Sequence, residues 1–121
     1  MKHQFIRQHS EEDCGPACVA TIAKYYGKTF TLSRVREAVG TGQFGTTLLG
    51  LKQGANKLGF NAKGFKANIE IVNKSKMPLP AIIHWKGYHW VVIYGKQGDK
   101  YIVADPAIGI RHLDARSLAE A

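Results

Sequence analysis

Two cysteines four residues apart, Cys14 and Cys18, are the side chains of this sequence best suited to covalent chemistry. Cys14 precedes Gly15-Pro16, and proline is favoured in a first helical turn, where its missing N–H is not needed. A cysteine at a helix start faces free backbone N–H groups and the positive end of the helix dipole, which lower the thiol pKa. Cys14 is therefore a candidate nucleophile, whereas Cys18, one turn further on, fits a small buried hydrophobe.

A cysteine nucleophile needs a base and a third group that orients the base. Of the five histidines, the two best placed are His84 and His89, on either side of a predicted turn. If a three-residue loop joins the predicted strands 89–95 and 100–105, His89 lies diagonal to Asp105 on one face, about 7–8 Å away. A loop of even length would turn Asp105 to the opposite face. The spacing permits a His89–Asp105 dyad without requiring it.

Gln8 lies six residues before Cys14, in the segment that leads into the predicted helix. Its side-chain amide, together with the backbone N–H of Cys14, is placed to hold the oxyanion of a tetrahedral intermediate. Taken alone, a glutamine in a polar loop more often points into solvent.

The order of the candidate residues along the chain is also informative. A cysteine on a helix, then a histidine on a strand, then an aspartate, is the chain order of papain-like peptidases.

The elements that must position these residues begin with helices. Apolar residues recur at helical spacing, and cap residues set the expected limits. The three expected helices are 14–26 before Gly27, 32–39 between Thr31 and Gly40, and 48–58 after Thr46 or Thr47. The third carries an apolar stripe, which we expect to be buried: Leu48, Leu51, Ala55 and Leu58.

The second half of the chain has the alternation and the β-branched and aromatic residues of strands. The expected strands are 60–65, 80–85, 89–94, 101–104 and 110–113, with a short helix over 69–72 and a last one capped by Asp114. Helices followed by an antiparallel sheet form an α+β pattern. The last helix reaches the chain end without a stop signal, as expected of a domain cut from a longer protein.

Composition bounds the class of protein. The 121 residues suit one domain, and 45% hydrophobic with 21% charged residues is an ordinary globular balance. No apolar run is long enough to span a bilayer and no signal peptide is present, so we expect a soluble cytoplasmic chain. The net charge is +8, but the lysines form no tight cluster and no nucleic-acid-binding motif accompanies them. A basic surface of this kind suits acidic peptide residues or an anionic membrane.

Three separated motifs give the sequence a specific resemblance that covers it from Gln8 to the last helix. They are Gln8-x-x-x-x-Asp13-Cys14-Gly15-x-Ala17-Cys18, then Pro80-Ala81-Ile82-Ile83-His84-Trp85 leading to His89-Trp90-Val91-Val92, then Ala104-Asp105-Pro106-Ala107. In this order they resemble the bacteriocin-processing cysteine peptidase domain of peptidase-containing ABC exporters. The resemblance implies one papain-like α+β domain over 1–121, its N-terminal helices packed on an antiparallel sheet. It also implies that the domain is the N-terminal part of a longer exporter, on the cytoplasmic side of the cell membrane.

The resemblance assigns a role to each matched position: nucleophile for Cys14, base for His89, orienting residue for Asp105 and oxyanion donor for Gln8. The implied reaction cuts a leader peptide after a Gly-Gly or Gly-Ala pair, without a cofactor. ATP would serve only the attached transporter. The implied partners are a precursor with an amphipathic helical leader and the transmembrane and ATPase domains of the exporter, with no nucleic acid.

Two smaller implications concern residues next to the catalytic positions. His84 matches a histidine of the family that is structural, and Trp90 stands where the family usually has Phe or Tyr.

The resemblance also implies how the substrate is bound. We expect an apolar groove leading to Cys14, because the leaders are amphipathic helices. A channel too narrow for a Cβ would explain a double-glycine requirement.

Two other functions stay open. One is a recognition domain that holds the precursor for the transporter without cutting it; degenerate family members of this type lack the cysteine that is retained here as Cys14. The other is a papain-like amidase or acyltransferase that acts on a small molecule. The nature of the substrate separates them from a leader peptidase.

Overall fold

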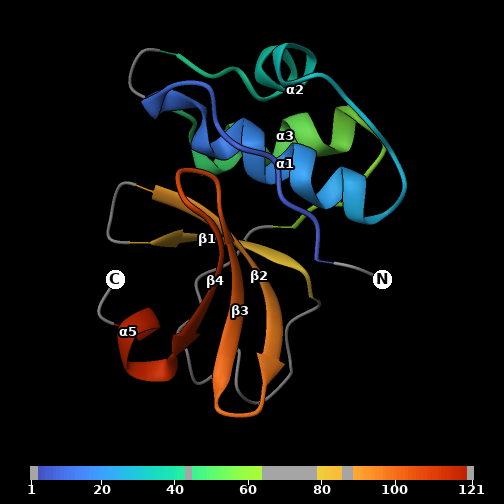
Figure 1. Ribbon diagram of the computed structural model, residues 1–121. Coiled ribbons are helices and arrows are strands. Elements are labelled where there is room, and N and C mark those ends of the chain that lie inside the picture. The colour runs from blue at the N-terminus through green and yellow to red at the C-terminus, as the bar shows by residue number, and fades with distance from the viewer. Residues whose placement is uncertain (1–2, 43–44, 64–78, 86–88, 120–121) are drawn as a thin grey trace.

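The computed structural model describes residues 3–42, 45–63, 79–85 and 89–119. Its helices are α1 (Cys14–Tyr25), α2 (Leu32–Val39), α3 (Leu48–Lys57) and α5 (Ala115–Ala119), and a 3-10 turn, η1 (Glu11–Asp13), leads into α1. Its strands are β1 (Ala81–Trp85), β2 (His89–Gln97), β3 (Lys100–Asp105) and β4 (Gly109–Asp114). The predicted α+β order, helices first and strands afterwards, is confirmed (Figure 1).

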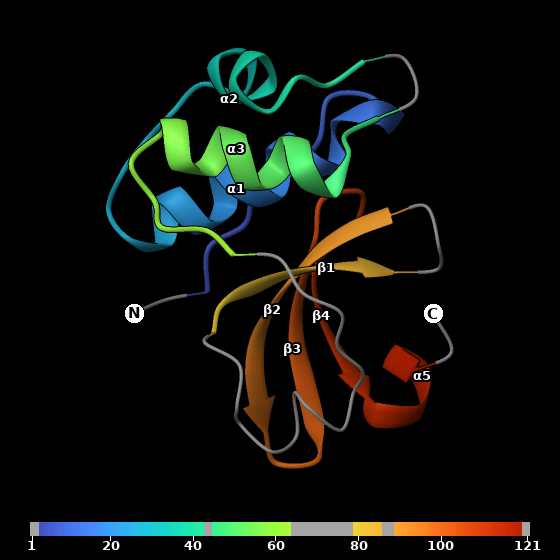
Figure 2. The same ribbon diagram turned by 180° about the vertical axis from the view of Figure 1, so that it is seen from behind.

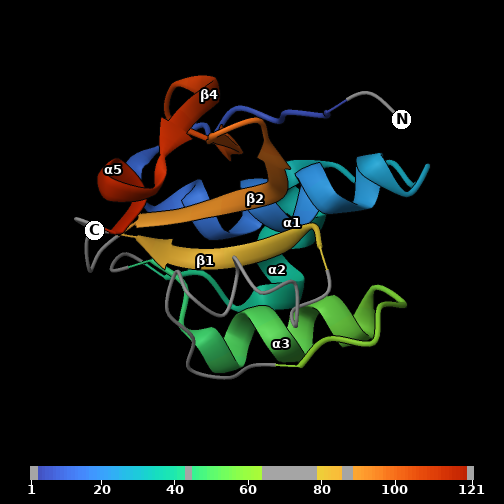
Figure 3. The same ribbon diagram turned by 90° about the horizontal axis from the view of Figure 1, so that it is seen from below.

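The sheet is antiparallel throughout, with its strands in the order β1-β2-β3-β4. The first three helices form a layer on one side of it, in which α1 contacts β2 while α2 and α3 pack on α1 and on each other (Figures 1 and 2). The short α5 lies apart from them, beside β4 (Figure 3). Among the described residues, no helix has the length and apolar character needed to cross a bilayer.

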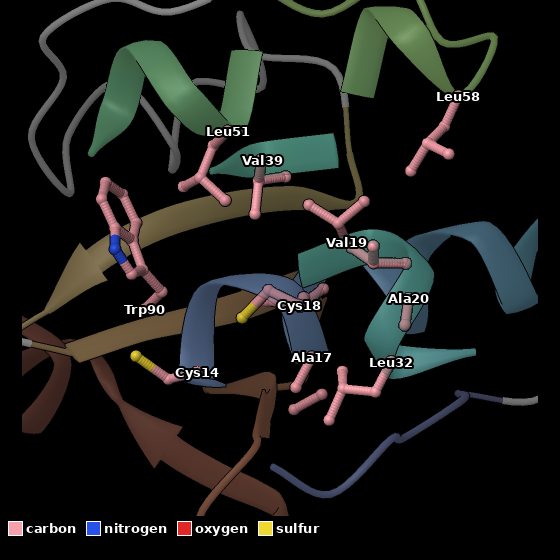
Figure 4. Packing of buried hydrophobic residues seen from close by; sticks show 13 residues of the cluster. Cys14, Ala17, Cys18, Val19, Ala20, Leu32, Val39, Leu51, Leu58 and Trp90 are labelled. Atoms are coloured by element: carbon pink, nitrogen blue, oxygen red, sulfur yellow. The ribbon is translucent and has the colours of Figure 1, made fainter. Parts of the chain in front are cut away.

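Two apolar clusters hold these layers together. The first joins the three helices to one face of the sheet (Figure 4), and its members include Cys14, Cys18, Val35, Leu51, Trp90, Val92 and Ala104. The second covers the other face of the sheet near α5 and contains Trp85, Val91, Ile93, Tyr101, Val103 and Leu118. Successive residues of β2 and β3 alternate between the two clusters, as the pleat of a strand requires.

The helix starts follow the predicted caps. The side-chain oxygens of Thr31, Thr47 and Asp114 each accept a hydrogen bond from the backbone N–H three residues on, at 3.1, 2.9 and 2.7 Å. Each bond satisfies a donor that the first turn of a helix leaves free. Gly40 ends α2 in the left-handed region, at φ 68°, as its position after the last apolar residue predicts.

Two expectations about the middle of the chain are not met. Leu48 is 52% exposed rather than buried, because it is the first residue of α3 and lies at the mouth of a pocket described below. The strand predicted over 60–65 is absent from its described part, since residues 60–63 have no regular structure and pair with no strand of the sheet. The predicted short helix over 69–72 lies outside the described residues.

The loop between β2 and β3 does not have the three residues for which a His89–Asp105 dyad was expected. Gln97 pairs with Lys100, so the turn contains two residues, Gly98 and Asp99. A regular hairpin with an even turn would place Asp105 on the face of the sheet opposite to His89.

An irregularity in β2 restores the expected face. The register shifts by one residue between Ile93 and Gly95, as in a β-bulge, so that Val92 pairs with Ala104. That pairing is the one that the three-residue loop was expected to give. His89 and Asp105 therefore share a face through the combination of an even turn and a bulge.

Candidate active site

Cys14 is the first residue of α1 and its side chain is almost covered, at 4% exposure. Its sulfur shares a hydrogen bond with the His89 side chain and accepts hydrogen bonds from the backbone N–H groups of Trp90 and Gly15. Figure 4 shows Cys14 at the start of the helix, beside Trp90. The helix start supplies the donors that stabilise a thiolate.

His89 is the first residue of β2 and lies between Cys14 and Asp105. Its Nε2 is 2.7 Å from Oδ1 of Asp105, the last residue of β3. The predicted His89–Asp105 proximity is thus present. With Nε2 bound to the carboxylate, Nδ1 is the ring nitrogen left for the sulfur.

The two groups shift each other's protonation. Burial by itself raises the pKa of the Cys14 thiol, but the hydrogen bonds from His89 and the Trp90 backbone outweigh burial and leave the pKa below its usual value of 9.0. The hydrogen bond to Asp105, followed by the one to Cys14, raises the pKa of His89 to about 9. These directions favour a thiolate beside an imidazolium.

Asp105 is 2% exposed, yet its environment favours the charged form. Burial raises its pKa, and hydrogen bonds from His89, from the Ala107 backbone and from Arg111 outweigh burial, so the net pKa is lowered. Oδ1 also accepts from the Ala107 N–H at 3.0 Å, and Oδ2 from Arg111 Nη1 at 3.3 Å. The carboxylate is therefore held by donors from three directions.

Gln8 lies beside the loop that follows Asp105. Its backbone N–H donates to the carbonyl of Pro106 at 2.9 Å, which ties the segment before α1 to the end of β3. Its side-chain Oε1 is buried and has no hydrogen-bond partner among the described residues. This placement brings the predicted oxyanion donor to the same end of the sheet as His89 and Asp105, and the donor role itself stays a prediction.

The other two candidate residues, Cys18 and His84, have different surroundings from Cys14, His89 and Asp105. Cys18 is fully buried in the first apolar cluster, where burial raises its pKa well above the usual value and keeps it a neutral thiol. His84 is exposed, and its ring stacks on Trp90 with 4.3 Å between ring centroids. Neither lies in the chain of hydrogen bonds that joins Cys14, His89 and Asp105.

Asp13, which precedes Cys14, is anchored by contacts with Ser10 and with α2. Ser10 Oγ donates to its Oδ2 at 3.0 Å, and Arg36 Nη1 of α2 lies 3.4 Å from its Oδ1. These contacts join η1 and the start of α1 to α2. Sequence reasoning gave Asp13 no role, and the acidic residue next to an uncapped helix start is the signal that could have indicated an anchor.

Gly15, the residue after Cys14, lies close to the loop that precedes α3. A Cβ on Gly15 would lie 2.9 Å from Cβ and Oγ1 of Thr46, a distance that side chains do not tolerate. Thr46 is held by Trp90, whose Nε1 donates to the Thr46 carbonyl at 3.0 Å, and by a 2.6 Å hydroxyl contact with Thr41. The loop before α3 therefore forms a fixed wall beside Cys14.

A pocket of about 630 Å³ opens beside this wall. Its lining is mostly apolar and comes from α1, α3, β1 and the segment after α3, with Trp90 at one side and the exposed Leu48 at its mouth. The other lining residues include Val19, Ile22, Leu51, Ala55, Phe60, Ile82 and the two lysines Lys52 and Lys63. An apolar pocket of the expected kind is thus present, and the sequence did not identify its residues. The lining includes Trp90 but not Cys14, so the expectation that the groove leads to Cys14 stays a prediction. In the described ranges, no three His, Cys, Asp or Glu side chains are grouped as a metal site.

The sequence matches the peptidase C39 family over residues 2–121. It is 44% identical over 110 residues to the lactococcin-G-processing and transport ATP-binding protein of Lactococcus lactis subsp. lactis, an alignment that covers 88% of this chain. It is 36% identical over 109 residues to the mesentericin-Y105 transport/processing ATP-binding protein of Leuconostoc mesenteroides, covering 87% of this chain. The chain spans only 16% and 15% of the lengths of these relatives.

Two solved structures are similar along almost the whole chain. A double glycine motif protease from an AMS/PCAT transporter, in complex with the leader peptide, matches with a TM-score of 0.93 and 31% identity, covering 98% of this chain and 84% of that one. The peptidase domain of Streptococcus ComA, a bi-functional ABC transporter of a quorum sensing pathway, matches with a TM-score of 0.88 and 29% identity, covering 98% and 91%.

Proposed function

The chain belongs to the peptidase C39 family of cysteine peptidases, and from that premise we propose that it cuts the leader from a bacteriocin-like precursor after a Gly-Gly or Gly-Ala pair. The observation that carries the proposal is the hydrogen-bonded chain from the Cys14 sulfur through His89 to Asp105, at the N-terminus of α1. It supplies a nucleophile, a proton carrier and a fixed counter-charge in one site.

In the proposed reaction, the Cys14 thiolate attacks the carbonyl carbon of the second glycine. The backbone N–H of Cys14 and the Gln8 amide stabilise the negative charge that moves to the carbonyl oxygen. His89 gives its proton to the leaving amine as the C–N bond breaks and a thioester forms. His89 then takes a proton from water, whose oxygen attacks the thioester. The C–S bond breaks, which releases the thiolate and a carboxylic acid that gives its proton to the solvent. Only side chains, backbone groups and water take part, so this step needs no cofactor.

The apolar pocket is suited to the leader. An amphipathic helix laid in it would bury its apolar face against residues such as Val19, Leu51 and Ile82. Lys52 and Lys63 at the lining would meet acidic residues of the same helix. Trp90 lines the pocket and its backbone contacts the Cys14 sulfur, so a helix seated with its C-terminus at Trp90 would bring the residues that follow it to Cys14.

The wall formed by Thr46 offers a steric reason for selecting glycine. It already lies too close to the start of α1 for a methyl group on Gly15, and Trp90 holds it in place. A substrate residue passing between this wall and Cys14 would be selected by exclusion of larger side chains.

The rest of the proposal concerns the longer protein. The relatives are transport and processing ATP-binding proteins several times longer than this chain. We infer that this domain is the N-terminal part of such an exporter, on the cytoplasmic side of the cell membrane. Its partners would be the transmembrane and ATPase domains, and ATP would be consumed there rather than at Cys14.

The test is cleavage of a synthetic leader that ends in Gly-Gly and carries a few cargo residues, followed by mass spectrometry. The expected result is one cut after the second glycine, lost in Cys14→Ala and retained in Cys18→Ala, which removes the other cysteine. Binding of the leader without a cut would instead favour a recognition domain. Neither a cut nor binding, with leaders of several cargo classes, would turn the assignment toward a small-molecule amidase or acyltransferase.

A further inference from the structure

Besides His89, a second cation contacts the Asp105 carboxylate. Arg111 Nη1 lies 3.3 Å from Asp105 Oδ2, whereas His89 Nε2 lies 2.7 Å from Oδ1. Arg111 is on β4, where it pairs with Val103 of β3, and this register places it diagonal to Asp105 on the same face of the sheet. The strand pairing therefore places Arg111 within reach of the Asp105 carboxylate.

Arg111 is itself held in place. Its guanidinium lies over the indole of Trp85, with 5.4 Å from Cζ to the ring centroid. Trp85 is buried at the end of β1, and its Nε1 donates to the carbonyl of Leu118 in α5 at 3.1 Å. The Arg111 side chain is 31% exposed, so two thirds of it is covered. A planar guanidinium that stacks on an aromatic ring and meets a carboxylate is a defined arrangement that lysine reproduces only in charge.

The charges of the site explain what Arg111 contributes. A Cys14 thiolate, a His89 imidazolium and an Asp105 carboxylate sum to one negative charge, which Arg111 brings to zero. Among the described residues, the titratable or charged groups that act on the imidazole and the carboxylate include Cys14 and Cys18 from α1 and Arg111 from β4. Cys18 is neutral, and the neighbour from β1 is the uncharged Trp85.

We propose that Arg111 is a positioning residue for the cysteine peptidase reaction. By holding Oδ2, it fixes the plane of the Asp105 carboxylate and turns Oδ1 toward His89. It also balances the negative charge that the site carries when Cys14 is a thiolate. This inference rests on the proposed function, since the reaction that Asp105 and His89 serve is the cleavage described above.

The test compares Arg111→Met, which keeps an apolar stem over Trp85, with Arg111→Lys, which keeps the charge. In each, kcat/KM for the leader peptide and the rate of alkylation of Cys14 by iodoacetamide are measured against pH. Arg111→Met is expected to lower kcat/KM about tenfold near neutral pH, because the group that orients the base is no longer fixed. It should also move both pH limits and the alkylation midpoint upward, because removal of a cation raises the pKa of each neighbouring group.

Arg111→Lys should keep the pH limits of the parent with a smaller loss of rate. Arg34→Met, which removes the same charge from an exposed position on α2, should change neither quantity. A loss of activity in Arg111→Met with unmoved pH limits would overturn the proposal and leave only packing on Trp85. Should the parent fail to cut any leader, the proposed function fails, and an alkylation midpoint that is the same in Arg111→Met and the parent would then overturn the role of Arg111 separately.

Discussion

Two aspartates of this domain are buried to the same degree, at 2% exposure, and each lies beside an arginine. Asp13 precedes the nucleophile in the chain and contacts Arg36 of α2. Asp105 comes 91 residues after Cys14 and contacts Arg111 of β4. The aspartate that is distant in sequence contacts His89 in space, and the adjacent one is held by Ser10 and Arg36 instead.

The difference lies in what each carboxylate accepts. Asp105 has donors on both oxygens, one of them the ring of His89. Asp13 has the Ser10 hydroxyl on one oxygen, while its other oxygen has the Arg36 ion pair but no hydrogen bond. Burial beside an arginine is thus common to an anchor and to a member of the site. The hydrogen bond to an ionisable partner is what distinguishes them.

The largest difference between the two aspartates is expected when each carboxylate is replaced by a neutral amide. Asp105→Asn should lower kcat/KM for the leader peptide by roughly 100-fold, because the amide cannot stabilise the imidazolium. Asp13→Asn should leave kcat/KM of the folded protein close to that of the parent. Equal losses in the two variants, measured on equal amounts of folded protein, would show that Asp105 has no special role.

The pH dependence of kcat/KM in the parent protein reports the protonation of Cys14 and His89. The ion pair exists above the lowered pKa of Cys14 and below the pKa of His89, about 9. Activity should therefore fall about tenfold per pH unit above about 9, where His89 loses the proton that the leaving amine needs. It should also fall on the acid side, where the thiolate is protonated.

The same two variants should separate in this profile. Asp105→Asn should move the alkaline limit downward, toward the ordinary histidine pKa of 6.5, because the group that raises the pKa of His89 most is gone. Asp13→Asn should leave both limits where they are in the parent. An alkaline limit that moves in Asp13→Asn would mean that this carboxylate also acts on His89.

Asp13 should matter instead for stability. Asp13→Ala removes the acceptor of Ser10 and the partner of Arg36, and we expect the free energy of unfolding to fall by about 1–3 kcal/mol. Urea denaturation followed by circular dichroism measures this change. A stability equal to that of the parent would show that the contacts among η1, α1 and α2 do not depend on this carboxylate.

The smallest effect is expected from the arginine that is 42% exposed, Arg36. Arg36→Gln should lower the free energy of unfolding by at most about 1 kcal/mol, because an ion pair made by a solvated guanidinium contributes little to stability. A double-mutant cycle with Asp13→Ala measures the coupling between the two side chains. A coupling close to zero would assign the stability role of Asp13 to Ser10 alone.

The local parts of the structure could be predicted from the sequence. Thr31, Thr47 and Asp114 cap the helices that they were expected to cap, because a cap depends only on residues within one turn. Cys14 is at a helix start for the same reason: Gly15-Pro16 and the apolar spacing that follows fix that boundary. Leu48 was expected to be buried, since periodicity does not show which helix face is left without a partner.

The contacts between residues far apart in the chain could not be predicted, because hydrophobic patterning does not fix the length of a turn or the register of paired strands. The position of Asp105 relative to His89 depends on a two-residue turn and on the register shift near Ile93, two irregularities whose effects cancel. The sequence left the His89–Asp105 dyad open because it does not fix the loop length, and a two-residue turn without the register shift would have excluded the dyad. Arg111 was missed because it reaches Asp105 only through the register of β3 with β4, which pairs Asp105 with Gly109.

The measurement that tests this account most directly is an NMR titration of the His89 imidazole in the parent protein, with Asp105→Asn beside it. His89 should titrate with a pKa of about 9 in the parent, because Asp105 and Cys14 stabilise its protonated form. In Asp105→Asn the pKa of His89 should be markedly lower. A midpoint near 6.5 in both proteins would contradict the claim that Cys14, His89 and Asp105 form one coupled site.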